Sequence, residues 1–286
     1  MAIVLIDAAA HAHAADWYSS GRGDPSGNGL TLTGDTVLPL HNLTIDTVLD
    51  EIIRRARSGG DVILVCHARD MGLALPLITG GPVRARTEAI GQLAIDQPTA
   101  DPVLPTPAIS AAEAAPVLMM SEAQVAALRV KMNQVRALRL RHVALRGCNV
   151  GTWSDTLPIY KRFFGCGSLS GPRMRDTYGA IDPGAPMADL TRWSSQHNHW
   201  HIFYDGSTGN QVALATTGGQ SEEHSYQIAL AYQTTQGLQD WGTRHLRGAV
   251  SGSFFYHGMW ETSAAPGSPR IHFVGDADYA SHLQVV

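Results

Sequence analysis

Short, continuous apolar runs alternate with longer amphipathic segments in the first part of the chain. Ala2–Ile6 is apolar throughout, and so is Asp61–Cys66 after its first residue. A further run of this kind is His142–Leu145. Runs of this length that are rich in Val, Ile and Leu are typical of strands buried on both faces of a parallel sheet. We therefore predict a strand at each of these places.

The amphipathic segments between these runs predict helices. Thr44 and Ser121 are polar residues of the kind that cap a helix N-terminus, and each precedes apolar positions at helical spacing. Gly59 and Gly60 follow the first of these segments and are expected to end it. The helices predicted in this way are Thr44–Arg57, Met71–Thr79, Ser121–Arg141 and Ser154–Phe164.

The alternation of strands and helices predicts an α/β fold. Such a pattern favours a mostly parallel central sheet with helices on both faces, which is a three-layer sandwich. Leu30–Leu40 can add a strand or a hairpin, and Cys166–Leu169 can begin another strand. Gln97–Pro116 is rich in Pro and Ala, and we interpret it as a loop or surface linker.

The pattern changes in the last third of the chain, where aromatic residues alternate with polar ones. His199–Tyr204 and Asn210–Thr216 predict a β-hairpin, and Glu222–Gln233 predicts a helix. We therefore divide the chain into an α/β domain, residues 1–190, and a β-rich or α+β extension, residues 191–286, packed on it.

Composition narrows the classes of function. The chain has 286 residues, a formal net charge of -4 and 44% hydrophobic residues. This charge gives no general attraction to nucleic acid or to an anionic membrane, so a partner must be recognised through a local site. The three cysteines are too few for a disulfide framework and favour a reducing compartment. The sequence thus predicts a cytoplasmic protein without a membrane span.

His67 and Cys148 each follow a predicted buried strand directly. Because parallel sheets place ligands at the carboxyl ends of their strands, both side chains are expected at that edge. A cysteine nucleophile reacts as its thiolate, and a nearby imidazole can take the thiol proton. Gly147 and Gly151 permit a tight turn around Cys148, which would leave the Cys148 amide available to a developing oxyanion.

The segments DVILVCHA, Asp61–Ala68, and HVALRGCNVG, His142–Gly151, resemble the His and Cys motifs of caspase-like cysteine peptidases. The Gly-Cys-x-x-Gly form is closest to the CHAT and separase branches, and the resemblance covers roughly residues 2–181. It implies a caspase-like sandwich in which His67 is the general base and acid and Cys148 is the nucleophile. Asn149 and Gly151 would shape the turn.

The same resemblance assigns part of the oxyanion hole to the amide of Ala68. Here the chain departs from the family, which usually has glycine at this position. If the backbone there required a positive φ, alanine would put the oxyanion hole in doubt.

Two acidic residues are candidates for substrate binding. Asp7 ends the first predicted strand, and Asp176 follows the possible strand at Cys166. A carboxylate beside the site would favour Arg or Lys in the substrate by charge pairing. The predicted function is therefore a cysteine endopeptidase that cleaves a protein or peptide through a thioester, with no cofactor or metal required.

Two alternatives remain open from the residues. His197, His199 and His201 alternate along a predicted strand and could bind a metal ion in a hydrolase. The chain could also be a caspase-like protein without catalysis that serves in a larger assembly. Trp and Tyr are common interface anchors, and aromatic residues concentrated in the last third could dock a protein partner: Trp193, Trp200, Phe203, Tyr204, Phe254, Phe255, Tyr256 and Trp260.

Overall fold

The computed structural model divides the chain into two units, each built from separate stretches of sequence. Unit 1 comprises Met1–Asp7, Leu40–Arg173 and Leu283–Val286, and unit 2 comprises Ala8–Pro39 and Met174–His282. The described residues are 2–8, 12–19, 36–96, 108–181, 190–195, 200–205, 211–216, 247–250, 253–260, 271–274 and 277–286.

The division differs from the predicted boundary between residues 190 and 191. Unit 2 begins its C-terminal segment at Met174, directly after Arg173, and it also includes Ala8–Pro39 from the N-terminal part of the chain. The last strand of the chain returns to the sheet of the first. A single boundary in the sequence cannot describe this division. Pairing between strands that are far apart in the chain determines which unit each segment joins.

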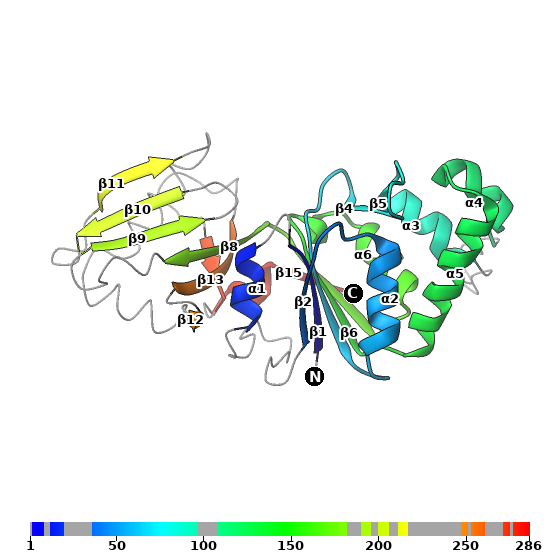
Figure 1. Cartoon of the computed structure of the whole chain (residues 1–286), viewed down its shortest axis with the longest axis horizontal. Coiled ribbons are helices and arrows are strands. Elements are labelled where there is room, and N and C mark those ends of the chain that lie inside the picture. The colour runs from blue at the N-terminus through cyan, green and yellow to red at the C-terminus, as the bar shows by residue number, and fades with distance from the viewer. Residues whose placement is uncertain are drawn as a thin grey trace. The chain divides into compact units, whose positions relative to one another are not determined.

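A six-stranded, mostly parallel sheet forms the centre of unit 1 (Figure 1). Its order is β15-β7-β6-β3-β1-β2. Neighbouring strands are parallel from β1 through β3 and β6 to β7, and β15 is antiparallel to β7. The α/β prediction and its buried strands are thereby confirmed. The strands are β1, Ala2–Asp7; β2, Thr36–Leu40; β3, Asp61–Val65; β6, His142–Arg146; β7, Ser168–Pro172; and β15, Leu283–Val285.

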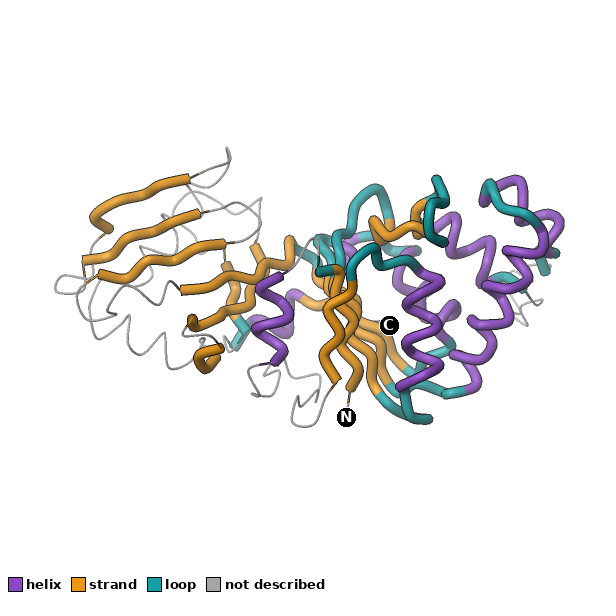
Figure 2. The backbone as a smooth tube through the Cα atoms, in the orientation of Figure 1, coloured by secondary structure: helices purple, strands orange, loops and turns teal. Residues whose placement is uncertain are grey.

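The helices of unit 1 lie together on one side of this sheet (Figure 2). From β2, at one edge of the sheet, the chain passes to β3, β6 and β7 in turn, which is a single direction across the sheet. Right-handed crossovers that step in one direction place their helices on one face, so the described helices do not form the two flanking layers that the sequence predicted. These helices are α2, Ile45–Arg55; α3, Thr87–Ala94; α4, Ala111–Leu118; α5, Glu122–Ala137; and α6, Thr156–Phe164.

The predicted helix caps are confirmed. Thr44 and Ser121 each accept a hydrogen bond from the backbone N–H three residues later, at 3.1 Å and 3.2 Å. Each side chain at that third position bonds back to the cap residue, so both termini form a capping box. These local contacts fix where the longest helices of unit 1 begin.

Two local predictions in unit 1 are wrong. The segment predicted as helix Met71–Thr79 contains strand β4, Gly72–Pro76, which pairs with β5, Arg84–Arg86. Gly72 lies so close to the opposite strand that a Cβ there would be 2.5 Å from the Ala85 carbonyl oxygen. In the predicted linker, residues 111–118 form α4, whose N-terminus Ser110 caps. Residues 97–107 lie outside the described residues.

Unit 2 is built around an antiparallel sheet of seven strands. The order is β11-β10-β9-β8-β13-β12, with β14 paired to β13. The predicted hairpin is confirmed as β10 and β11, whereas Glu222–Gln233 lies outside the described residues. The strands are β8, Arg175–Ile181; β9, Leu190–Ser195; β10, Trp200–Asp205; β11, Gln211–Thr216; β12, Arg247–Val250; β13, Ser253–Trp260; and β14, Ile271–Phe273.

Unit 2 also contains helix α1, Ala12–Ser19, and the short 3-10 helix η2, Tyr279–His282. Across the described ranges of both units, every helix falls short of the combined length and apolar character needed to cross a bilayer.

Candidate active site at the carboxyl edge of the parallel sheet

The strand register brings His67 and Cys148 to the same level of the sheet. Strands β3 and β6 are parallel neighbours, and their register ends with Val65 opposite Arg146. The backbone N–H of Cys66 then donates to the Arg146 carbonyl oxygen at 3.1 Å. His67 and Cys148 each come two residues after this last register pair, so both leave the sheet side by side at its carboxyl edge.

The turn after His67 is held by backbone pairing with β4. The His67 carbonyl accepts from the Ala74 N–H at 2.8 Å, and the Arg69 N–H donates to the Gly72 carbonyl at 2.9 Å. Between these two bonds, Ala68 forms an antiparallel bridge with Leu73. The pairing with β4 therefore uses the His67 carbonyl and the Arg69 N–H, and it does not use the N–H of Ala68.

The turn after Cys148 is equally well defined. Asn149 has a left-handed backbone with φ 58°, and the short 3-10 helix η1, Val150–Thr152, follows it. A Cβ on Gly151 would lie 2.4 Å from the carbonyl oxygen of Gly171 in β7. Gly151 therefore lets the turn after Cys148 lie directly against the next strand.

Gly147 lies where the turn before Cys148 approaches the turn that carries His67. A Cβ at this position would lie 2.8 Å from both the Cys66 carbonyl oxygen and the Ala68 Cβ, and 3.3 Å from the Ala68 nitrogen. The segment that carries His67 therefore passes directly against the residue that precedes Cys148, and only glycine permits this approach. Ala68 is not among the residues with a positive φ, so its departure from the family glycine creates no backbone strain.

The electrostatic environment favours a neutral imidazole at His67. His67 is exposed at the sheet edge, yet the protein around its ring lowers its pKa by desolvation. Asp7 opposes this pKa shift and Arg69 adds to it. Asp7 ends β1, whose register with β3 pairs Ile6 with Val65, so its carboxylate belongs to the same edge of the sheet. A neutral ring is the form that can accept a proton from a thiol.

The three cysteines differ in accessibility. Cys66 is buried, and burial raises its pKa well above the ordinary value, with further contributions from Asp7 and Cys148. Burial also raises the pKa of Cys166 to about 11. Cys148 is only half-buried. Since reactive cysteines must be both accessible and able to ionise, Cys148 is the thiol best suited to a nucleophilic role.

Asp176, the second predicted substrate-binding residue, belongs to unit 2 and is buried, with 1% of its surface exposed. Its carboxylate lies 2.7 Å from Nε2 of the buried His257, and it accepts a hydrogen bond from the Tyr178 hydroxyl at 3.4 Å. The prediction that Asp176 binds a substrate cation is therefore wrong, because core side chains already surround its carboxylate.

The histidines predicted as metal ligands are not described as a group. His197 and His199 lie outside the described residues, and His201 is placed only as part of β10. The aromatic side chains predicted to dock a partner also lie outside the described side chains. Both predictions stay predictions.

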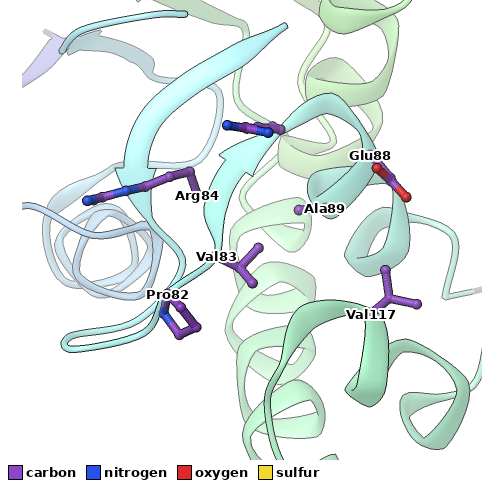
Figure 3. Close-up of a pocket in the computed structure, with 7 residues that line it drawn as sticks. Pro82, Val83, Arg84, Glu88, Ala89 and Val117 are labelled. Atoms are coloured by element: carbon purple, nitrogen blue, oxygen red, sulfur yellow. The ribbon is translucent and has the colours of Figure 1, made fainter. Parts of the chain in front are cut away.

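A pocket of about 300 Å³ lies elsewhere in unit 1, near the end of β5 and the start of α3 (Figure 3). Val83, Ala89 and Val117 give it an apolar wall. Arg86, which also lines the pocket, pairs with Asp70 at 3.1 Å. None of the predicted site residues lines this pocket, so it does not coincide with the candidate active site.

Sequence reasoning missed one cluster of ligand-type side chains, His272, Asp278 and His282 in unit 2. The signal that could have found part of it is the spacing of four between Asp278 and His282, which places two side chains on one face of a helical turn. His272 comes from a separate strand, and only the fold brings it to the other two.

The chain matches no protein family model, no curated protein and no solved structure in the comparisons with known proteins.

Proposed function

We propose that this protein is a cysteine endopeptidase, related to the caspase-like group through its His and Cys segments, in which His67 and Cys148 form the catalytic dyad. One observation carries the proposal: the register of β3 and β6 brings these two residues to neighbouring strand ends at one level. The close approach of Gly147 to the His67 turn and the incomplete burial of Cys148 support it.

The proposed reaction follows from these positions. The Cys148 thiol gives its proton to His67, and the sulfur attacks the carbonyl carbon of the scissile peptide bond to form a C–S bond. The amides of Ala68 and Cys148 would stabilise the oxyanion. When the C–N bond breaks, His67 protonates the leaving amine and a thioester remains. Water, deprotonated by His67, then attacks the thioester, which releases the carboxylate product and the thiol.

Asp7 suggests the kind of substrate. Its carboxylate interacts electrostatically with His67 and Cys66, which are on or directly after the neighbouring strand. A peptide bound across this edge would meet a negative charge, so the proposal includes a preference for Arg or Lys beside the scissile bond. A thiol of this kind requires a reducing environment to stay free, so the proposal includes the cytoplasm as the site of action.

The test uses a peptide probe that carries Arg and a thiol-reactive group, together with cleavage of Arg-containing and Lys-containing peptides. We expect Cys148→Ala and His67→Ala to abolish cleavage, and Cys148→Ala to abolish labelling. Cys166→Ala is the matched control, because it removes a buried thiol of unit 1 and should retain both. Mass spectrometry of the labelled chain identifies the modified residue.

The possible results separate the proposed function from its alternatives. Undiminished cleavage by Cys148→Ala contradicts the peptidase mechanism. A native chain that folds but is neither labelled at Cys148 nor able to cleave peptides favours the non-catalytic alternative. Cleavage that depends on His197, His199 and His201 would instead favour the metal-dependent hydrolase.

A further inference from the structure

A cluster of two imidazoles and one carboxylate lies in unit 2, and the proposed peptidase mechanism does not use it. It consists of His272, Asp278 and His282, each of which offers one ligand atom, and these atoms all lie within 4.8 Å of one another. His272 Nδ1 is 2.8 Å from Asp278 Oδ2, and His282 Nε2 is 3.5 Å from the same oxygen. The two imidazole ring centres are 3.9 Å apart.

The local fold holds these side chains from two directions. His272 lies in β14, which pairs with β13 through the register of Met259 with His272. Directly after this strand, the Val274 N–H donates to the His257 carbonyl oxygen at 2.9 Å. On the other side, Tyr279 begins η2, and its buried hydroxyl lies 3.4 Å from His257 Nε2. Both arms of the cluster are thus anchored on His257 of β13.

The turn that carries Asp278 is also fixed. Its carbonyl oxygen accepts hydrogen bonds from the Ser281 N–H at 2.9 Å and the Ser281 hydroxyl at 2.6 Å. This turn sets Asp278 and His282, four residues apart, on the same side of η2. The segments that carry the three residues are therefore held by contacts that do not require a metal ion.

Burial distinguishes the cluster from a surface group of polar residues. The side chains of His272 and His282 are 11% and 22% exposed, whereas that of Asp278 is 55% exposed. Nε2 of His282 is buried and has no hydrogen-bond partner among the described residues. A buried ring nitrogen in this state is costly, and a bound cation would satisfy it. The exposed side at Asp278 leaves room for water as a further ligand.

We propose that His272, Asp278 and His282 bind a zinc ion, which joins β14 to η2. Two imidazole nitrogens and one carboxylate oxygen suit Zn²⁺ better than Mg²⁺ or Ca²⁺, which prefer oxygen ligands. Tetrahedral Zn–N and Zn–O bonds of about 2.0–2.2 Å separate neighbouring ligand atoms by roughly 3.3 Å. The measured separations of 2.8 Å and 3.5 Å from the Asp278 oxygen lie on either side of this spacing.

The experiment measures zinc binding to the full, tag-free chain after removal of metal with a chelator. A Cys148→Ala background prevents the proposed catalytic thiol from binding zinc. Competition with a chromophoric chelator gives the affinity and stoichiometry, and the visible spectrum of bound Co²⁺ reports the ligand geometry. We expect a stoichiometric ion that raises the thermal midpoint of unfolding, together with a Co²⁺ spectrum typical of four or five ligands.

Variants identify the ligands. His272→Ala and His282→Ala are expected to abolish stoichiometric binding, and Asp278→Asn to weaken zinc affinity by at least roughly tenfold. His41→Ala is the matched control, because it removes an exposed histidine of unit 1 and should leave binding unchanged. Circular dichroism establishes that each variant is folded, and the Asp278→Asn variant changes a side chain that is 55% exposed.

Three results would overturn the proposal. They are the absence of stoichiometric zinc in the parent chain, full zinc affinity in the folded Asp278→Asn variant, and loss of zinc in a variant with His197, His199 and His201 changed to Ala. The last result would assign the metal to the histidines predicted from sequence. Since peptide cleavage is not a readout here, a failure of the zinc site and a failure of the peptidase proposal remain distinguishable.

Discussion

A histidine interacts with an aspartate in each unit, but the two pairs differ in their surroundings. In unit 2, His257 is fully enclosed, with a side chain 0% exposed, and its Nε2 lies 2.7 Å from Asp176. Its ring stacks on Tyr178 at a centroid distance of 4.2 Å. In unit 1, His67 is exposed at a strand end, and Asp7 affects it through charge.

This difference shows why a histidine–aspartate pair does not by itself indicate chemistry. The pair in unit 2 is closed by aromatic rings and forms part of a core, where a substrate could not reach it. The imidazole in unit 1 is accessible, and the half-buried Cys148 follows the end of the neighbouring strand. Accessibility and the identity of the adjacent side chains, and not the pair alone, distinguish the candidate site.

The largest expected effect tests this contrast through stability. His257→Ala should lower the free energy of unfolding by about 3–5 kcal/mol, because it removes the imidazole that lies 2.7 Å from the buried Asp176 carboxylate. His67→Ala should change stability by less than about 0.5 kcal/mol, as for other exposed sites. Urea unfolding measures both changes, and hydrogen exchange in β8 and β13 locates the first. Equal destabilisation by the two variants would contradict the comparison.

The next effect concerns the contact between the two turns of the candidate site. Gly147→Ala should cost about 1–3 kcal/mol of stability, because its Cβ would collide with backbone atoms. It should also reduce kcat/KM by at least about tenfold, since a small displacement of reacting groups is costly.

Gly91→Ala is the matched control for this prediction. The nearest atom to a Cβ at Gly91 would be 3.9 Å away, and Gly91 lies within helix α3. Alanine there should be neutral or stabilise the protein by up to about 1 kcal/mol. Full peptidase activity in Gly147→Ala would show that the approach of the two turns is not needed for catalysis.

A smaller effect is expected in the pH dependence of activity. Peptide cleavage should rise with pH as His67 loses its proton, with a midpoint below the ordinary pKa of histidine because desolvation by the protein around the ring lowers the pKa of His67. Asp7 favours the protonated ring, so Asp7→Asn should move this midpoint to still lower pH. A kcat/KM profile measures the shift. Asp50→Asn, an exposed change, is the control, and a shift of the Asp7→Asn midpoint to higher pH would contradict the assignment.

The smallest effect concerns a second buried histidine, His142 of β6, which hydrogen-bonds the hydroxyls of Ser168 and Ser170 instead of a carboxylate. Desolvation lowers its pKa, with a further contribution from Arg146. The unfolded chain therefore binds more protons than the folded one between this lowered pKa and the ordinary histidine value. Stability should rise with pH across this window and fall as the solution becomes acidic.

The slope that His142 contributes should not exceed about 1.4 kcal/mol per pH unit, the value for one proton. His142→Gln should reduce the slope of the unfolding free energy against pH, as urea titrations at several pH values would show. An unchanged slope would mean that His142 carries no part of the pH dependence.

The strand ends of the candidate site were predictable because their pattern is local. β1, β3 and β6 are short, largely apolar runs, and His67 and Cys148 each come two residues after the end of β3 or β6. The caps at Thr44 and Ser121 were predictable for the same reason, since each depends on contacts three residues apart. Such features need no knowledge of distant parts of the chain.

Other features could not be predicted, because residues far apart in sequence create them. The approach of Gly147 to Ala68 and the enclosure of Asp176 by His257 and Tyr178 depend on which strands pair. So does the strand character of residues 72–76, which an adjacent strand at 84–86 stabilises against a helical pattern.

The sequence by itself determined the buried strands, the main helix caps and the two residues proposed for catalysis, because burial patterns and capping act over a few residues. Tertiary structure alone decided how the chain divides into units, which aspartate stays accessible, and which histidines gather with Asp278. The physical reason is that pairing and packing join segments whose separation along the chain carries no information about their distance in space.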